Sequence, residues 1–357
     1  MLGFEKDYPN AKRVLLNINY RSTKNIVEAS SRLIACNKER FAKEIVSQKG
    51  EGKPVVTKIC GDAGEETLRI VKEISDYTRA GYSLSDMAVL YRTSLEPRLL
   101  VEKLMEYNIP FAMHDSLPNL YEHWISRNII SYIQVALGSR ERQKVMEIIN
   151  RPKRYVSRDA LEDPIISWES LKSFYQDKGW MVERIEQLEY DLHMVSKMAP
   201  VAAVNYIRKA VGYDDYLREY ADFRRMKPEE LLETADQLQE SAAGFPTFEA
   251  WFAHMEEYKK ELQSQARSQD RNRTEENCLY LMTMHSSKGL EYKIVFILDA
   301  NEGITPHRKA VLDADLEEER RMFYVAMTRA KERLHIYSVK ERYGKKQDIS
   351  RFIGEYT

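Results

Sequence analysis

The chain has 357 residues, 43% of them hydrophobic, and a formal net charge of −1. This length and apolar content suit two or three domains with buried cores. The near-neutral charge excludes a protein that binds nucleic acid through an overall positive charge, so any phosphate contact must come from local clusters of basic residues.

The cysteines and the apolar segments indicate a soluble, intracellular protein. Cys36, Cys60 and Cys278 are scattered through apolar surroundings, which fits buried thiols in a reducing cytoplasm and argues against a disulfide framework or a zinc site. No apolar run approaches the ~20 residues of a membrane span, and the first residues lack the layout of a signal peptide. We therefore expect a cytoplasmic protein that contacts no membrane and binds no metal through its own side chains.

Strand and helix patterns alternate along the first 112 residues. Apolar, β-branched runs predict strands at residues 13–22, 53–60, 86–94 and 109–114. Helical spacing of apolar residues predicts helices at 23–37, 65–81 and 96–108. Such alternation is typical of βαβ units, in which helices cover both faces of a parallel sheet.

From about residue 115 to about residue 275 the strand patterns disappear. Helical periodicity predicts helices at 124–137, 143–150, 202–211, 228–242 and 248–265, followed by an exposed, charged connection at 264–277. Strand patterns then return at 278–287, 292–300 and 333–341. The simplest architecture is one α/β domain with a parallel sheet, formed by residues 1–112 and 276–357, into which an all-helical domain of residues 113–275 is inserted.

Residues 316–334, LEEERRMFYVAMTRAKERL, pose the main functional question. Helical spacing would place Leu316, Phe323, Met327 and Leu334 on one buried face, with the charges on the other faces. Arg321 and Arg329 are then either surface arginines with internal ion pairs or side chains directed at an anion.

Two segments imitate nucleotide-binding motifs. Residues 49–55, KGEGKPV, lack the glycine spacing of a phosphate loop, and Pro54 follows the lysine, so we interpret them as a turn before a strand. Asp299 ends the apolar run IVFILD, which imitates the strand and aspartate that hold magnesium in nucleotide hydrolases. No phosphate loop occurs in this sequence, so that interpretation lacks its necessary partner.

Three segments combine basic and hydroxyl residues. Tyr20 and Arg21 follow a predicted strand, His285 to Lys288 follow another, and residues 316–334 are the third. Open parallel sheets bind ligands outside the carboxyl ends of their strands, where we expect these segments to lie. Each also has a plain structural interpretation: Tyr20 as a core aromatic residue, His285 as a loop histidine and Lys288 as a solvated lysine.

The blocks NYRST, YRT....R, HSSKGLEY, EG..PH and EEERR.FYVAMTRAKE resemble, in order and spacing, the C-terminal motor motifs of superfamily 1A DNA helicases, the UvrD/Rep/PcrA group. The resemblance covers essentially the whole chain and implies a second RecA-like domain with a helical domain inserted in it. The first RecA-like domain of that family, with its phosphate loop, has no counterpart here. We therefore expect the chain to begin part-way along a longer protein.

The resemblance implies nucleotide-binding roles for individual residues. Arg21 and Arg329 would reach the γ-phosphate of ATP from across an inter-domain cleft, Tyr20 would stack on the adenine, and Glu291 would accept a hydrogen bond from the ribose. Lys288 would contact phosphate or form a structural ion pair, and Arg321 would organise its helix through the glutamates. The missing N-terminal RecA-like domain would hold most of the ATP and the Mg²⁺.

The resemblance also implies a DNA track. Arg92, His285 and His307 would line single-stranded DNA, although Ser94 stands where an asparagine is common. In the inserted domain, Tyr155, Val156 and Ser157 replace a Gly-Ile-Gly turn that lies against duplex in relatives, while the basic side chains of Lys153, Arg154 and Arg158 remain. The implied partners are therefore single-stranded DNA and a junction between single-stranded and double-stranded DNA.

Two hypotheses of different class follow. The chain is the C-terminal motor half of an ATP-dependent 3′-to-5′ DNA helicase for DNA repair, replication or recombination, and this half alone should not hydrolyse ATP. Alternatively, it is a non-catalytic DNA- or partner-binding protein built on a degenerate helicase half. The sequence does not separate a repair helicase from the motor subunit of a nuclease–helicase.

Overall fold

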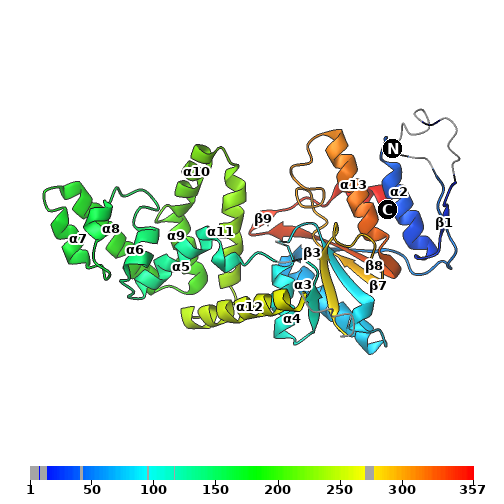
Figure 1. The fold of residues 1–357 in the computed structure, drawn as a ribbon, viewed down its shortest axis with the longest axis horizontal. Helices are drawn as coiled ribbons and strands as arrows, with labels where there is room; N and C mark the ends of the chain where they lie inside the picture. Colours follow the sequence, from blue (N-terminus) through cyan, green and yellow to red (C-terminus); the bar gives the residue numbers. More distant parts are fainter. Residues whose placement is uncertain (1–7, 9–13, 41–42, 95, 116, 270–276) are drawn as a thin grey trace. The chain divides into compact units, whose positions relative to one another are not determined.

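The computed structural model describes residues 8, 14–40, 43–94, 96–115, 117–269 and 277–357. The chain divides into two compact units (Figure 1). The split unit comprises Met1–Pro118 and Leu262–Thr357, and the helical unit comprises Asn119–Glu261. The sequence suggested boundaries after residues 112 and 275, whereas the structural boundaries follow residues 118 and 261.

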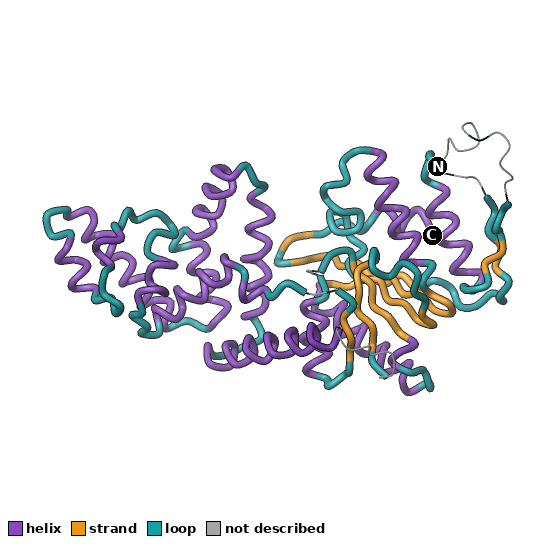
Figure 2. The backbone as a smooth tube through the Cα atoms, viewed as in Figure 1, coloured by secondary structure: helices purple, strands orange, loops and turns teal. Residues whose placement is uncertain are grey.

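The core of the split unit is a seven-stranded sheet (Figure 2). Its strands lie in the order β3-β8-β7-β4-β6-β5, and β9 pairs with β8; all the pairs are parallel except β8–β9. The bounds are β3 Val56–Asp62, β4 Met87–Tyr91, β5 Phe111–Met113, β6 Leu279–Thr283, β7 Tyr292–Ile297, β8 Ala330–Arg342 and β9 Lys345–Lys346. All five residues of β4 are buried, as expected for a central parallel strand.

Helices cover both faces of this sheet. On one face lie α2 (Lys24–Ala35), α13 (Asp313–Met327) and α14 (Arg351–Tyr356), which share a core with alternate residues of β7 such as Val295 and Ile297. On the other face lies α3 (Ala63–Arg79), whose Tyr77 contacts the intervening Phe296, and α4 (Arg98–Glu106) packs against α3. The predicted α/β class, with a parallel sheet and an inserted helical stretch, is confirmed.

The strand predicted at residues 13–22 is wrong in length and in position. Strand β1 is only Ile18–Asn19, and it pairs with β2 (Val46–Ser47) in a separate two-stranded sheet. The side chains of Val14, Leu15 and Leu16 are exposed, so the apolar run that predicted a buried strand is not buried within the described chain.

The helical unit contains no β-strand among its described residues. Its helices are η2 Leu120–Glu122, α5 Trp124–Ala136, α6 Arg142–Ile148, η3 Arg158–Leu161, α7 Trp168–Phe174, α8 Gly179–Ser196, α9 Pro200–Lys209, α10 Tyr213–Arg224, α11 Pro228–Ala242 and the first part of α12, Phe248–Gln269. Helices α7, α8 and α10 were not among those expected from periodicity. None of the helices in the described ranges is both long and apolar enough to cross a membrane.

The charged connection expected at residues 264–277 is partly wrong. Helix α12 continues to Gln269, and the buried Gln265 side chain donates a hydrogen bond to the Phe111 carbonyl (3.2 Å). The helix continues into the charged segment, where the buried Gln265 amide finds its hydrogen-bond partner in the carbonyl of a β5 residue. The remaining residues of the connection, 270–276, lie outside the described residues.

Asp299, which imitates a magnesium ligand in the sequence, has a structural role. It is buried and its carboxylate pairs with the Arg342 guanidinium at 2.9 Å. Its backbone N–H donates to a carboxylate oxygen of Glu66 (3.2 Å). Burial raises the pKa of both acids, and the positive charge of Arg342 opposes that shift. The cluster is therefore a buried acid pair stabilised by one guanidinium.

We predict that Arg342→Met destabilises the chain by about 3–5 kcal/mol, because it leaves a buried carboxylate without its counter-charge. Urea unfolding followed by circular dichroism measures the loss. Arg351→Met is the matched control: Arg351 also pairs with a carboxylate, Glu302, but its side chain is 54% exposed, so we expect at most about 1 kcal/mol. Equal losses in the two variants would contradict the structural role given to Arg342.

Candidate functional site

Three segments that are far apart in the sequence meet at the amino ends of β7 and β8. Ser22 Oγ donates to the Ala330 carbonyl at 2.6 Å, and the Thr23 N–H donates to the Lys331 carbonyl at 3.1 Å. On the other side, the Tyr292 N–H donates to the Arg329 carbonyl at 2.9 Å. The turn after β1, the start of β7 and the start of β8 are therefore fixed to one another by main-chain contacts.

Two cations share one carboxylate at this edge, and a third lies close by. Glu291 accepts from Arg21 Nε at 2.5 Å with one oxygen and from Lys331 Nζ at 2.8 Å with the other. Hydrogen bonds from Lys331 and Arg21 lower the pKa of Glu291 to about 2, so the carboxylate stays ionised at neutral pH. The turn that carries Arg21 is shaped by Asn19, whose side-chain oxygen accepts from the backbone N–H groups of Arg21 and Ser22.

Arg329 is the third cation, and it is buried. Its guanidinium donates to the carbonyls of Val325 (2.9 Å) and Leu290 (3.0 Å) and to the Thr328 hydroxyl (3.1 Å). Burial lowers the pKa of Arg329, and the nearby charge of Arg21 lowers it further. Within the described residues no carboxylate forms an ion pair with Arg329, although the nearby charge of Glu291 opposes the lowering of its pKa.

A hollow of about 420 Å³ lies beside these cations. It is lined by Ile18, Asn19, Tyr20, Arg21 and Glu291. The Tyr20 ring is 63% exposed, so its face is available to a planar ligand. The structure thus brings together all four residues predicted to contact nucleotide: Tyr20, Arg21, Glu291 and Arg329.

Two expectations about this region were wrong. Glu291 and Arg329 precede β7 and β8, so they lie at the amino ends of these strands and not at the carboxyl ends, whereas Tyr20 and Arg21 follow β1 as expected. The helix predicted over residues 316–334 ends at Met327, so Arg329 lies in a turn and Leu334 is a buried residue of β8.

The other arginines of this segment are engaged within the protein. Arg320 is buried and forms a two-pronged ion pair with Glu355 while donating to the Asn37 side chain. Arg321 pairs with Glu317 and Glu318 of its own helix, in agreement with the organising role expected for it.

A second group lies near the carboxyl ends of β4 and β6. Arg92 follows β4 and makes a two-pronged ion pair with Glu319 of α13, with a shortest distance of 2.6 Å. The backbone N–H of His307 donates to the same carboxylate at 3.0 Å. Burial and the charge of Arg92 lower the pKa of His307, so its ring is neutral at pH 7. The predicted contacts Arg92 and His307 are therefore organised by one acid, Glu319.

His285 and Lys288 lie in the turn after β6, and both side chains are exposed. The turn is held by Asp115, which accepts from the Thr283 N–H (2.7 Å) and from the Ser286 hydroxyl (2.5 Å). Two roles were predicted for Lys288, a phosphate contact and a structural ion pair. Lys288 has no carboxylate partner in the described part of the chain, so the structural ion pair is not seen.

Comparison with known proteins agrees with the sequence motifs. The family described as "UvrD-like helicase C-terminal domain" matches residues 14–341. The chain belongs to the UvrD-like helicase family. It is 30% identical to the putative ATP-dependent DNA helicase YjcD of Bacillus subtilis (strain 168), with 99% of this chain and 47% of that protein aligned. It is 32% identical to the ATP-dependent DNA helicase PcrA of Staphylococcus epidermidis, with 99% and 51% aligned.

The chain spans about half the length of the curated relatives it matches. The family resemblance drawn from its motifs is confirmed, whereas the roles of individual residues remain predictions. Sequence reasoning missed three residues of this UvrD-like chain that organise its two edges: Lys331, Glu319 and Asp115. Lys331 and Glu319 lie within the motif block EEERR.FYVAMTRAKE, so the block itself was a signal for them.

In the helical unit of this UvrD-like chain, one of the three predicted DNA contacts is not available. Arg154 is buried, and its Nη1 donates to the Tyr132 hydroxyl (3.0 Å) and to the carbonyls of Ile148 (3.1 Å) and Ile149 (3.2 Å). It supports the turn from inside, so we withdraw it from the predicted DNA contacts. Lys153 and Arg158 are exposed, and Lys153 pairs with the exposed Glu219 at 3.1 Å.

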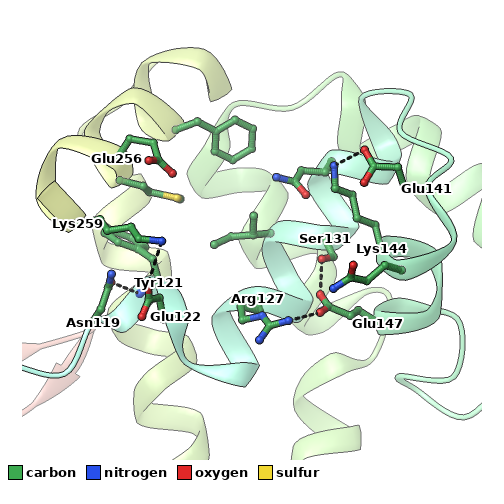
Figure 3. Close-up of a pocket in the computed structure, with 15 residues that line it drawn as sticks. Asn119, Tyr121, Glu122, Arg127, Ser131, Glu141, Lys144, Glu147, Glu256 and Lys259 are labelled. Carbon is green, nitrogen blue, oxygen red and sulfur yellow. Dashed lines mark hydrogen bonds and ion pairs between the residues drawn. The ribbon is translucent and has the colours of Figure 1, made fainter. Parts of the chain in front are cut away.

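A second pocket, in the helical unit, is lined by cations that are all paired (Figure 3). Its volume is about 420 Å³, and it lies between α5, α6 and α12. Each of its three cations pairs with a glutamate: Lys259 with Glu122, Lys144 with Glu141, and Arg127 with Glu147. Glu256 adds a fourth carboxylate, so the lining is not suited to phosphate.

We predict that Ser22→Ala destabilises the split unit by about 1–3 kcal/mol, because the buried Ala330 carbonyl loses its hydroxyl donor. Thermal melting by differential scanning calorimetry measures the change. Ser173→Ala is the control, since Ser173 is an exposed residue of α7, and it should melt like the parent. A Ser22 variant as stable as this control would show that the hydroxyl does not fix the turn.

Proposed function

We propose that this chain is the C-terminal motor half of an ATP-dependent 3′-to-5′ DNA helicase acting in DNA repair, replication or recombination. In this proposal Arg21 and Arg329 contact the γ-phosphate of ATP held by a second RecA-like domain. The observation that carries it is the convergence of Arg21, Arg329 and Lys331 at one sheet edge, where Glu291 pairs with Arg21 and Lys331 but not with Arg329. A phosphate would supply the missing negative charge.

The chemistry of the side chains supports these roles. A guanidinium is permanently charged and can bond two oxygens at once, which suits the charge that spreads over a transferring phosphoryl group. In this proposal Tyr20 would stack on the adenine, and Glu291 would accept a hydrogen bond from the ribose. Glu291 holds Arg21 in the structure, so phosphate would compete with this carboxylate for the same guanidinium.

An exposed apolar strip supports a partner domain at the same edge. Ile18 and Val46 of the small sheet are 51% and 60% exposed, and the side chains of Val14, Leu15 and Leu16 precede them. An apolar strip of this kind marks a surface that another domain covers. We assign that place to the N-terminal RecA-like domain, which would also hold Mg²⁺, because the described residues group no three acids, histidines or cysteines that could bind a metal.

The DNA contacts are proposed for the opposite edge of the sheet. Arg92, His285 and His307 would line single-stranded DNA, with Arg92 and His307 positioned by Glu319. Lys153 and Arg158 of the helical unit would contact the backbone of duplex at the junction, without Arg154. Cationic side chains suit phosphates and exposed rings suit bases.

We predict that Arg329→Ala reduces ATP turnover by a few orders of magnitude in a protein that joins this chain to a RecA-like domain with a phosphate loop. ATP affinity should fall far less, because the guanidinium acts mainly where charge develops in the transition state. DNA-stimulated phosphate release measures turnover, and this chain alone is expected to show none.

Arg321→Ala is the matched control, because Arg321 belongs to the same segment but pairs with its own helix. It should leave turnover unchanged, whereas Arg329→Lys should restore little because an ammonium lacks the planar fork. Turnover of Arg329→Ala within about threefold of the parent, at equal melting temperature, would mean that this arginine does not act on nucleotide.

We predict that His285→Ala weakens binding of the chain to single-stranded DNA by about fivefold or more, because an exposed ring that stacks on a base contributes about 1–3 kcal/mol. Fluorescence anisotropy with a labelled oligothymidylate measures the affinity. His193→Ala, at an exposed histidine of α8, is the control and should bind like the parent. Equal affinities for the two variants would remove His285 from the proposed track.

A further inference from the structure

Two exposed aromatic rings flank one guanidinium in the helical unit. The Arg184 guanidinium lies 4.8 Å from the ring centroid of Trp180 and 5.4 Å from that of Tyr155. Trp180 is 51% exposed and Tyr155 is 67% exposed. Trp180 and Arg184 are one turn apart on α8, while Tyr155 comes from the turn before η3. We call these three residues the Tyr155 cluster.

Tyr155 holds its ring outward at a conformational cost. Its φ is +62°, a left-handed backbone conformation that is rare for a bulky residue and typical of glycine. The backbone around it is fixed: Val156 exchanges two hydrogen bonds with the Asn150 side chain (2.8 and 3.0 Å), and the Ser157 N–H donates to the Tyr175 hydroxyl (2.7 Å). Because strain of this kind persists where the surroundings enforce it, the exposed ring is a built feature of the turn.

The cation in this cluster contacts the two rings but has no described hydrogen-bond partner. Arg184 forms no ion pair or hydrogen bond with any residue that the structure describes, so its N–H donors are free while its guanidinium lies over the rings. Lys153 and Arg158, both exposed, lie two residues before and three residues after Tyr155. Flat rings beside free cationic donors match the alternation of bases and phosphates along an unpaired strand.

We propose that the Tyr155 cluster is a stacking platform for unpaired nucleotides, with bases on Tyr155 and Trp180 and a phosphate at Arg184. This proposal rests on the proposed function, which requires a single strand to be present. The platform would be a second surface, in the helical unit, that binds this strand. A duplex presents phosphates but hides its base faces, so this platform favours single-stranded over double-stranded nucleic acid. An apolar protein partner would leave the free guanidinium donors of Arg184 unsatisfied.

The test uses the intact chain and the intrinsic fluorescence of Trp180, which is exposed, whereas Trp168 and Trp251 are buried and Trp124 is partly buried. An oligothymidylate should quench the emission, and an abasic strand of equal length and charge should quench it little. Tyr155→Gly should weaken oligothymidylate binding about fivefold or more while leaving abasic-strand and blunt-duplex affinities unchanged. Glycine adopts the left-handed conformation freely, so this variant should melt at or above the parent temperature.

Further variants separate stacking from charge. Trp180→Phe should abolish the quench, and Arg184→Lys should weaken binding because it keeps the charge but loses the planar group. Tyr190→Ala is the matched control, since Tyr190 is 56% exposed on the same helix, and it should bind like the parent.

The outcomes distinguish the platform from the motor function. Parent-like binding by Tyr155→Gly, together with weakened binding by His285→Ala, would overturn the platform and leave the proposed function intact. If Tyr155→Gly weakened binding of the abasic strand as much as binding of the oligothymidylate, stacking would be overturned and the cluster would bind phosphate alone. Quenching by a duplex as strong as by the single strand would overturn the preference for unpaired bases. No binding of any single strand would overturn both proposals.

Discussion

The register between β7 and β8 is the constraint on which the proposed nucleotide edge depends. Tyr292 lies opposite Ala330, so Glu291 and Arg329, the residues before them, are brought to the same place. The turn carrying Arg21 is then tied to the start of β8 by Ser22, which lies 308 positions from Ala330 in the sequence. A slip of either strand would separate Glu291 from Arg329, because each residue of register shifts a strand by ~3.3 Å.

Helix α13 links the two edges of the sheet. Glu319, near its middle, holds Arg92 and the His307 backbone at the carboxyl edge, whereas Arg329 follows its end at the amino edge. Met327 lies eight residues after Glu319, which corresponds to ~12 Å of helix at 1.5 Å per residue. Glu319 and the turn that carries Arg329 are thus joined by one continuous helix that packs in the core of the split unit.

The sequence predicted the elements whose pattern is local. The strands β3, β4, β6 and β7 stand out as apolar runs, and the motif blocks identified the family before any contact was known. It failed where distant residues decide the outcome. Arg154 was read as a surface charge because its run is basic, yet the Tyr132 hydroxyl and main-chain carbonyls bury it. Arg329 was placed on a helix because the pattern continues past Met327, whereas pairing with β7 turns the residues from Ala330 into a strand.

The buried arginines differ in which groups contact their guanidinium. This difference distinguishes arginines with a structural role from an arginine that we propose binds a ligand. Arg320 and Arg342 each meet a carboxylate, so their charge is balanced by folding alone. Arg154 is solvated by the Tyr132 hydroxyl and by main-chain carbonyls within the helical unit. Arg329 is also solvated by carbonyls, but Arg21 lies close enough to lower its pKa further. With Lys331, that edge holds three positive charges. In the described chain Glu291 pairs with two of them, Arg21 and Lys331. Uncompensated charge costs free energy in the folded state. An anion that binds there removes this cost, so the edge is less stable alone than with the ligand it is shaped to receive.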